Sequence, residues 1–513
     1  MFESAELGHK VGKQEFSEAV PELRTQLLAV QRALRERDIP VLIIVSGVEG
    51  AGKSAVVNRL HEWLDPRGLS THAFWDETDE ERERPGAWRF WRVLPARGAT
   101  GVMFGSWYTK PIIESALGDQ DLDALAAEMN RIAESERMLT DDGLVIIKLW
   151  FHISQDVQAQ VLTQRERQEK KGKKDKKGKK HKKGRKGGKR IQLSPLAKRF
   201  SKHYPAFAEV SERALRLTDR GNAPWHVIEA TDRRYRDLST GRILLERMQQ
   251  AVAQHDARQE PAPAATPVEA GNGLTVLDHV DLEQRLEPEI YAERLEAAQD
   301  RLHDLAWKLH DRRESSVVAV FEGWDASGKG GAIRRVTSAL DARLYRVIPI
   351  AAPTDEERAH HYLWRFWRYV PRNGYLRFYD RSWYGRVLVE RVEGFAAEAE
   401  WSRAYAEINT FEEELARHGV IVLKFWIHIS SEEQLRRFRH REVTEWKKHK
   451  LTDEDWRNRE RRPGYEAAIH EMVSRTSTPH APWTLVSGND KRVARVQIVE
   501  TFCDALARGL RSD

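Results

Sequence analysis

The stretch VVAVFEGWDASGKGG at residues 317–331 decides the fold. Its apolar, largely β-branched start is typical of a buried strand, and the glycines after it fit the pattern G-x-x-x-x-G-K at the start of a helix. Such glycines let consecutive backbone N–H groups turn toward a phosphate, and the helix N-terminus adds positive potential. The stretch therefore predicts a phosphate-binding loop, in which Gly323, Gly328 and Gly330 shape the backbone and Lys329 reaches the phosphate oxygens.

The same pattern occurs once more, since VLIIVSGVEGAGKSA at 41–55 aligns with the stretch without a gap. Gly47 and Gly323 open the two loops, an offset of 323 minus 47, or 276 residues. Three further matches share this offset: TDEER at 78–82 and 354–358, WRFWR at 88–92 and 364–368, and SWY at 106–108 and 382–384. A common register over that length indicates a tandem duplication.

The register changes once, at a basic insertion in the first copy. APW at 223–225 matches APW at 481–483, an offset of 258, so the first copy carries 276 minus 258, or 18, extra residues. From Lys170 to Arg190 there are fourteen Lys or Arg against Asp175, a net +13, which leaves 6 minus 13, or −7, for the rest of the chain. Such a run is usually a solvated, disordered loop. A basic run can also hold a polyanion, and both interpretations stay open.

A chain of 513 residues is too long for one ordinary core, which predicts two domains. We place the first at 1–255 with its insertion at 170–190, a linker rich in Pro, Ala and Gly at 256–273, and the second domain at 274–513. The longest apolar runs have only strand length, the N-terminus lacks an apolar signal segment, and the single Cys503 has no partner for an internal disulfide. These features favour a cytoplasmic protein that does not cross a membrane.

Strand candidates alternate with helical patterns in both copies. In the second copy they are YRVIPI at 345–350, LRFYD at 376–380, VIVLKFWIHI at 420–429 and WTLVSG at 483–488. This alternation predicts an α/β fold, with two tandem P-loop domains that each place a parallel sheet between helical layers.

The second copy also provides carboxylates for a metal ion. Gly330 stands where such loops usually carry Ser or Thr, so the hydroxyl that normally binds Mg²⁺ is missing. Asp325 in the loop and Asp380 after the LRFYD strand are the expected Mg²⁺ ligands, because this ion takes one or two carboxylates with phosphates and water. A structural salt bridge is the alternative for Asp380. Arg381 and Arg386 are expected to neutralise charge on a transferred phosphoryl group.

A second group of cations follows in an Arg-rich helical stretch at 436–450. Its members are Arg437, Arg441, Lys447, Lys448 and Lys450, interleaved with aromatic residues. We interpret the stretch as a helical lid whose cations close over phosphates. A solvated, charged helix is the alternative.

The first copy lacks most of these groups. Lys53 and Ser54 complete its loop motif, whereas the positions of four catalytic candidates, Asp325, Asp380, Arg381 and Arg386, hold Glu49, Phe104, Gly105 and Lys110. A phenylalanine cannot bind Mg²⁺. The first copy is therefore expected to have a binding or supporting role without catalysis, and the second copy is expected to catalyse the reaction.

Together, these motifs resemble the polyphosphate kinase 2 family over nearly the whole chain. The residues that carry the resemblance are FEGWDASGKGG at 321–331, YDRSWYGR at 379–386, KFWIHIS at 424–430 and HAPW with NDKRVAR at 480–495. The two-domain arrangement resembles the polyphosphate:AMP phosphotransferases, in which AMP accepts a phosphoryl group from inorganic polyphosphate. The resemblance implies a fold similar to thymidylate kinase with a helical lid. It also implies roles for Asp325, Lys329, Asp380, Arg381 and the lid cations.

The chain departs from single-domain members at Trp324, where those often carry Arg, and at its basic insertion. We expect a direct, Mg²⁺-assisted in-line transfer to AMP that gives ADP, with polyphosphate, AMP and ADP as partners, no membrane or nucleic acid, and self-association left open. The alternatives are an ADP kinase that uses polyphosphate, a nucleotide kinase that uses ATP, and a polyanion-binding scaffold without turnover.

Overall fold

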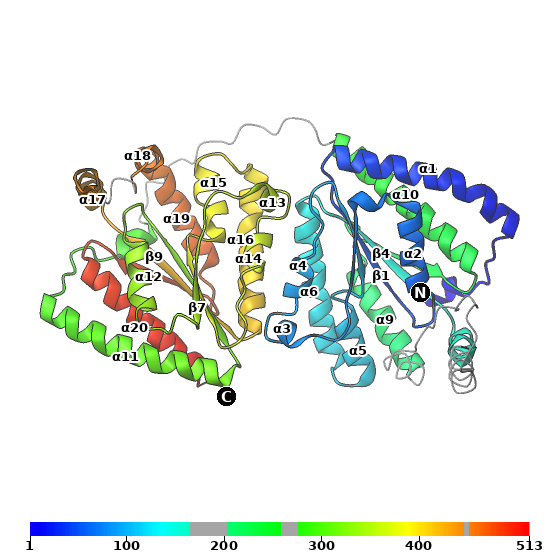
Figure 1. Ribbon diagram of the computed structural model, residues 1–513, viewed down its shortest axis with the longest axis horizontal. Helices are drawn as coiled ribbons and strands as arrows, with labels where there is room; N and C mark the ends of the chain where they lie inside the picture. The colour runs from blue at the N-terminus through cyan, green and yellow to red at the C-terminus, as the bar shows by residue number, and fades with distance from the viewer. Residues whose placement is uncertain (165–202, 258–274, 446–450, 512–513) are drawn as a thin grey trace, which may run out of the picture. The chain divides into compact units, whose positions relative to one another are not determined.

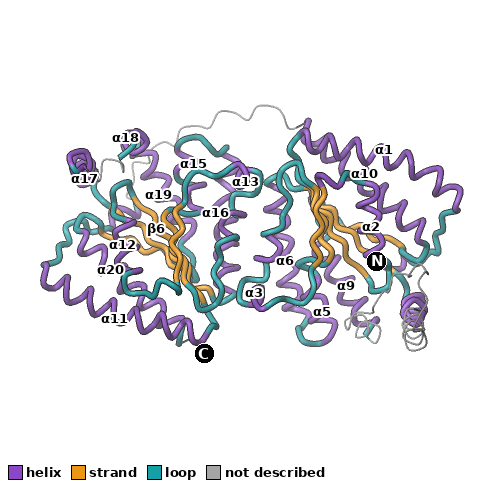
Figure 2. Tube along the Cα trace, viewed as in Figure 1, coloured by secondary structure: helices purple, strands orange, loops and turns teal. Residues whose placement is uncertain are grey.

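The computed structural model describes residues 1–164, 203–257, 275–445 and 451–511. The chain forms two compact units, Met1–Asp76 with Val93–Glu260 and Glu77–Arg92 with Pro261–Asp513, called here the first and second domains. Each contains one five-stranded sheet (Figures 1 and 2). The predicted α/β class with two tandem domains is confirmed.

The sheet of the first domain is parallel and has the order β2-β3-β1-β4-β5. Its central strand β1 precedes the loop at Lys53, as predicted. The strands are β1 (Val41–Gly47), β2 (Leu69–Ala73), β3 (Thr100–Phe104), β4 (Val145–His152) and β5 (Trp225–Glu229). In the described part of residues 1–257 the helices are η1 (Phe2–Ala5), α1 (Lys13–Glu36), α2 (Lys53–Trp63), η2 (Pro66–Gly68), α3 (Asp79–Arg82), α4 (Trp88–Trp91), α5 (Thr109–Leu117), α6 (Leu122–Asp141), α9 (Tyr204–Thr218) and α10 (Arg233–Ala257).

The second sheet repeats this topology as β7-β8-β6-β9-β10, again parallel. Every strand predicted for the second copy is present: β6 (Ser316–Gly323), β7 (Tyr345–Pro349), β8 (Leu376–Asp380), β9 (Val420–His428) and β10 (Trp483–Ser487). The helices are η3 (Val276–His279), α11 (Pro288–Arg312), α12 (Lys329–Thr337), α13 (Asp355–Arg358), α14 (Trp364–Trp367), η4 (Trp383–Arg386), α15 (Val389–Val392), α16 (Glu398–Arg417), α17 (Ser431–Val443), α18 (Asp453–Glu460), α19 (Arg462–Thr476) and α20 (Lys491–Gly509).

Helices cover both faces of the second sheet, which explains why β6 reads as one apolar run. Residues 317–321 of β6 are at most 1% exposed. On one face the alternate side chains Val317, Ala319 and Phe321 share a core with α11, α12 and α20, while α16 and α19 lie on the other face (Figure 1). The phosphate-binding loop therefore follows the central strand at the carboxyl edge of the sheet, where ligands of open parallel sheets bind.

Among the helices of the described residues, none has both the length and the apolar composition that a membrane span requires. Cys503 lies in the core of the second domain, where burial raises the pKa of its thiol to about 11. That pKa keeps the thiol protonated and unreactive near neutral pH.

Candidate active site

The loop of the second domain has the geometry of a phosphate-binding nest. Gly323 ends β6 with a φ of 146°, and a Cβ atom there would lie 2.6 Å from the backbone oxygen of Ile427, so only glycine fits. Gly328 caps α12 in the left-handed region, and Lys329 begins the helix. The Nζ atom of Lys329 donates to the oxygens of Gly323 (2.7 Å) and Trp324 (3.3 Å). The lysine is thereby held across the mouth of the loop, where phosphates bind in this motif.

Two non-glycine residues of the site have left-handed backbones. Ala326 in the loop has a φ of 61°, and Arg381 after β8 has a φ of 65°. The aligned residues of the first domain are glycines, Gly50 and Gly105, with φ values of 95° and 80°. Left-handed conformations cost an L-residue about 1–2 kcal/mol. The second domain thus has backbone strain at two positions where the first domain has glycine.

The Asp325 carboxylate is fixed from two sides. Its Oδ1 accepts from the Arg381 guanidinium at 3.1 Å, and its Oδ2 accepts from the Asn458 side chain at 3.0 Å. Tyr465 in turn donates to Asn458 at 3.2 Å. The predicted residues Asp325 and Arg381 therefore meet, although 56 positions separate them in the sequence. Sequence analysis did not identify Asn458, because a single amide in a helix of charged residues forms no recognisable motif.

Asp380 lies close to Gly330, the position at which the common motif has a hydroxyl side chain. One of its carboxylate oxygens lies 3.9 Å from the position that a Cβ atom would take at Gly330. A carboxylate from β8 therefore approaches the residue that is Ser or Thr in the common motif. In the described part of the chain no three His, Cys, Asp or Glu residues gather as a metal site. Two carboxylates with substrate phosphates still fit Mg²⁺, which prefers hard oxygen ligands.

A buried carboxyl group that sequence analysis missed supports this region. Glu322, at 5% exposure, accepts a hydrogen bond from the Ser382 hydroxyl at 2.8 Å. Burial raises its pKa, and the charges of Lys329 and Arg381 oppose that rise. The first domain has Ser46 at the aligned position. Glu322 thus links the end of β6 to the turn that carries Arg381.

Arg437 and Arg441 lie on α17, which ends at Val443, inside the helical stretch predicted at 436–450. The Arg437 side chain is 5% exposed, and all five of its N–H groups are bonded. Besides Glu433, its acceptors are the backbone oxygens of Ala326, Ser327, Gly488 and Asn489. Arg437 therefore braces the phosphate-binding loop against the turn after β10.

Arg386 lies on η4, and its guanidinium lies over the ring of Tyr362 at 4.7 Å. It forms ion pairs with Glu390 (3.2 Å) and Glu400 (3.9 Å). The predicted lid residues Lys447, Lys448 and Lys450 lie outside the described residues, as do the insertion at 170–190 and the linker from 258 to 273.

A pocket opens beside Asp325. Its lining residues are Glu322, Gly323, Trp324, Asp325, Arg381, Gly385, Leu388, Val389, Trp426, Asn458 and Tyr465. Trp324 forms part of the wall, donates to Nδ1 of His428 at 3.0 Å and lies under the Arg462 guanidinium at 4.1 Å. Burial and Arg462 lower the pKa of His428 to about 4, which keeps the acceptor nitrogen unprotonated.

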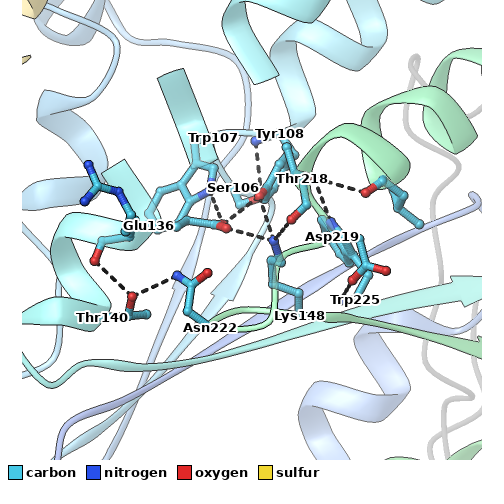
Figure 3. Close-up of polar contacts among 12 residues, drawn as sticks. Ser106, Trp107, Tyr108, Glu136, Thr140, Lys148, Thr218, Asp219, Asn222 and Trp225 are labelled. Carbon is cyan, nitrogen blue, oxygen red and sulfur yellow. Dashed lines mark hydrogen bonds and ion pairs between the residues drawn. The ribbon is translucent and has the colours of Figure 1, made fainter. Parts of the chain in front are cut away.

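A buried ion pair below the site occurs in both domains. In the second domain Lys424 of β9 donates to Glu412 of α16 at 2.7 Å, and Glu412 also accepts from Trp383 and Tyr384 just after Arg381. Figure 3 shows the same network in the first domain, where Glu136 accepts from Lys148, Trp107 and Tyr108. The network ties the turn after β8 to the sheet of the second domain, and the turn after β3 to the sheet of the first.

The loop of the first domain keeps its shape but not its charges. Lys53 donates to the oxygens of Gly47 (2.7 Å) and Val48 (3.0 Å), as Lys329 does in the second domain. Glu49 approaches Lys53 at 3.6 Å. The strand that precedes its SWY turn ends at Phe104, which offers no metal ligand. This domain has a phosphate-binding loop without the carboxylate and guanidinium after the neighbouring strand.

Comparisons with known proteins agree over the full length. The family Polyphosphate kinase 2 (PPK2) matches twice, at residues 10–256 and 285–512. The polyphosphate:AMP phosphotransferase of Pseudomonas aeruginosa is 47% identical, and that of Pseudomonas syringae pv. tomato 46%. All of this chain and at least 99% of each relative are covered. A solved structure from Pseudomonas aeruginosa, described as polyphosphate kinase 2, superimposes with a TM-score of 0.86 at 45% identity and covers both chains fully.

Proposed function

We propose that this chain, which belongs to the polyphosphate kinase 2 family, transfers a phosphoryl group from inorganic polyphosphate to AMP in its second domain alone. The chain is an enzyme of the polyphosphate:AMP phosphotransferase type, since two relatives of that name match its whole length. The product formed from AMP is ADP.

One difference between the domains carries the assignment to the second. Strand β8 ends in Asp380 and continues with Arg381, whereas the aligned β3 ends in Phe104 and continues with Gly105. Phosphoryl transfer proceeds through a state with charge spread over the equatorial oxygens, so it depends on groups that neutralise this charge. Of the two aligned strands, only β8 of the second domain is followed by these groups.

The transfer itself needs positioning more than covalent chemistry. Lys329 and Arg381 supply positive charge at the mouth of the loop and at the end of β8. The bond of Arg381 to Asp325 fixes the guanidinium at 3.1 Å, so its direction is set before substrate binds. Glu322, Arg437 and the Glu412 network hold the segments that carry these groups.

Asp325 and Asp380 would hold Mg²⁺, because both are carboxylates at the carboxyl edge of adjacent strands and Asp380 faces Gly330. When bound, the ion supplies positive charge to the phosphate groups. The remaining charge compensation comes from the protein side chains.

The pocket beside Asp325 supports a nucleoside monophosphate as the acceptor. Trp324, Trp426 and Tyr465 contribute aromatic rings to its lining, which suit the flat face of a base. Trp324 also takes the place of a cation often found in single-domain members. Fewer cations near the acceptor disfavour a diphosphate, so AMP should have a higher kcat/KM than ADP.

The test is an assay of the purified chain with AMP, polyphosphate and Mg²⁺ but no ATP, with nucleotides separated by chromatography. ADP should form, at a rate that depends on the polyphosphate concentration. ADP formation only after ATP is added would show a nucleotide kinase of another type. Polyphosphate binding without any nucleotide product would show a scaffold. Equal kcat/KM for AMP and ADP would contradict the choice of acceptor.

A further inference from the structure

Guanidinium groups gather along α12, where Arg334 and Arg335 lie in the last turn. Arg334 donates from Nε to the oxygen of Gly330 at 3.2 Å. Arg495 of α20 lies against the next residue, since its Nη2 is 3.8 Å from the position that a Cβ atom would take at Gly331. Arg335 follows on α12, which packs against α20. The first of these cations in the sequence, Arg334, follows Lys329 by five residues on the same helix.

The first domain has an ion pair at the same place. Arg335 aligns with Arg59 at the offset of 276, and Arg495 aligns with Asp237 at the offset of 258. Arg59 donates to Asp237 at 3.3 Å. By this alignment, Arg335 and Arg495 occupy positions whose side chains bond to each other in the first domain, and in the second domain the helices that carry them pack together. Where the first domain has a salt bridge, the second domain therefore has two like charges.

The charges at the four aligned positions differ between the domains. The second domain has Arg334, Arg335, Ala494 and Arg495, a sum of +3, and the first has Asn58, Arg59, Arg236 and Asp237, a sum of +1. In the first domain Asp237 also accepts from Arg236 at 2.7 Å, so its cations share a carboxylate. Among the ion pairs of the described residues, none includes Arg335 or Arg495. Neighbouring guanidinium groups without a carboxylate repel each other, and a bound anion would relieve that repulsion.

The position of these cations relative to the loop indicates which anion they meet. Arg437 bonds both Ser327 in the loop and Gly488 in the turn before α20, at 2.7 and 2.6 Å. The start of α20 is thus fixed to the loop that holds the reacting phosphates. A linear chain of phosphates that passes Lys329 on this side would continue along Arg335 and Arg495. A mononucleotide acceptor would end before them.

We propose that Arg335 and Arg495 form a subsite for polyphosphate beyond the reacting phosphate, which sets the affinity for the donor without taking part in the transfer. The inference rests on the proposed function, because it takes polyphosphate as the donor of the second domain.

The substitution Arg495→Asp tests the subsite sharply, because it rebuilds the ion pair of the first domain. It should keep or raise the unfolding temperature of the protein without ligand, since a repulsive pair becomes an attractive one. The KM for long-chain polyphosphate should rise about tenfold, and the salt dependence of that KM should become flatter, because one or more ionic contacts are lost. The KM for AMP and the kcat at saturation should stay within about twofold.

Asp237→Arg is the matched control in the first domain. It should lower the unfolding temperature, because Arg59 and Arg236 lose the carboxylate that they share, and leave the KM for polyphosphate unchanged. Arg495→Gln serves as a milder second variant and should raise the same KM by a smaller factor.

An unchanged KM and salt dependence in both Arg495 variants would overturn the proposal, as would an equal rise in the KM for AMP. Wild-type protein that does not turn over AMP and polyphosphate would refute the proposed function instead. In that case, the rise in unfolding temperature caused by added polyphosphate still tests the subsite, and it should be smaller in Arg495→Asp than in the wild type.

Discussion

Arg381 holds its guanidinium in place at a cost in backbone energy, and substituting it should separate stability from activity. Its φ of 65° lies in the left-handed region, where the first domain has Gly105 at 80°. Arg381→Gly removes the side chain and relaxes the backbone. Arg381→Ala removes the same side chain but keeps a Cβ atom in the left-handed region. The difference between the two variants therefore isolates the backbone.

The expected magnitude follows from two opposing effects. A left-handed L-residue costs about 1–2 kcal/mol, which glycine avoids. Glycine also makes the unfolded chain more flexible, which costs about 0.5–1 kcal/mol. Loss of the Arg381–Asp325 bond affects both variants equally, and with an arginine side chain 44% exposed it contributes at most about 1 kcal/mol. Arg381→Gly should therefore be more stable than Arg381→Ala by about 1 kcal/mol.

Scanning calorimetry of the full chain measures this difference. About 1 kcal/mol corresponds to a shift of about 2–4 °C in the midpoint of a domain of this size. Both variants should lose about a hundredfold or more in turnover, the usual loss for a group that stabilises developing charge. As the matched control, Gly105→Ala introduces a Cβ atom 2.9 Å from the oxygen of Phe74 in the first domain. It should lower the stability without changing turnover.

Equal midpoints for Arg381→Gly and Arg381→Ala would refute the claim of strain. Turnover near the wild-type rate in either variant would refute the catalytic role of the guanidinium.

Three further predictions concern the supporting segments. Glu412→Gln should reduce kcat about tenfold with little change in the KM for either substrate. Its counterpart in the network of Figure 3, Glu136→Gln, should lower only the thermal midpoint. Equal kcat values for the two variants would refute the positioning role of Glu412. Arg437→Lys should raise the KM for polyphosphate and reduce kcat, because a lysine cannot bond the loop and the turn after β10 at once, and unchanged kinetics would contradict the bracing role. Deletion of residues 170–190 should raise the KM for long-chain polyphosphate and flatten its salt dependence at nearly unchanged kcat; identical kinetics at low salt would favour a solvated loop.

Much of the fold could be predicted because each signal was strong and occurred twice. The apolar run 317–321 predicted a buried strand of a parallel sheet, and the glycines after it predicted the loop that follows this strand. The repeat supplied the second domain by alignment alone. The grouping of residues Glu77–Arg92 with the second domain had no such signal, because a repeat shows which segments correspond and not which copy a segment packs against.

The candidate site was predictable only where a residue type implies its chemistry. Asp325, Lys329 and Arg381 stand in motifs with known physical roles, and the structure brings Asp325 and Arg381 together. Glu322 gave no signal, because it is a single carboxyl at the end of a strand whose burial appears only after folding. Asn458 reaches Asp325 through the packing of α18, which local sequence does not determine.

Arg437 illustrates a different limit. An arginine in a basic helix suggests a phosphate ligand, yet from the middle of α17 the Arg437 side chain reaches four backbone oxygens. Whether a cation meets substrate or backbone depends on tertiary geometry, which charge patterning does not encode.

The central claim is that the second domain alone catalyses, and paired lysine substitutions test it most directly. Lys329 and Lys53 make the same two bonds to their loops, so Lys329→Ala and Lys53→Ala remove equivalent side chains. Initial rates of ADP formation from AMP and polyphosphate at saturating substrate should fall at least about a hundredfold for Lys329→Ala and remain within a few fold of wild type for Lys53→Ala. Comparable losses in the two variants would contradict the claim.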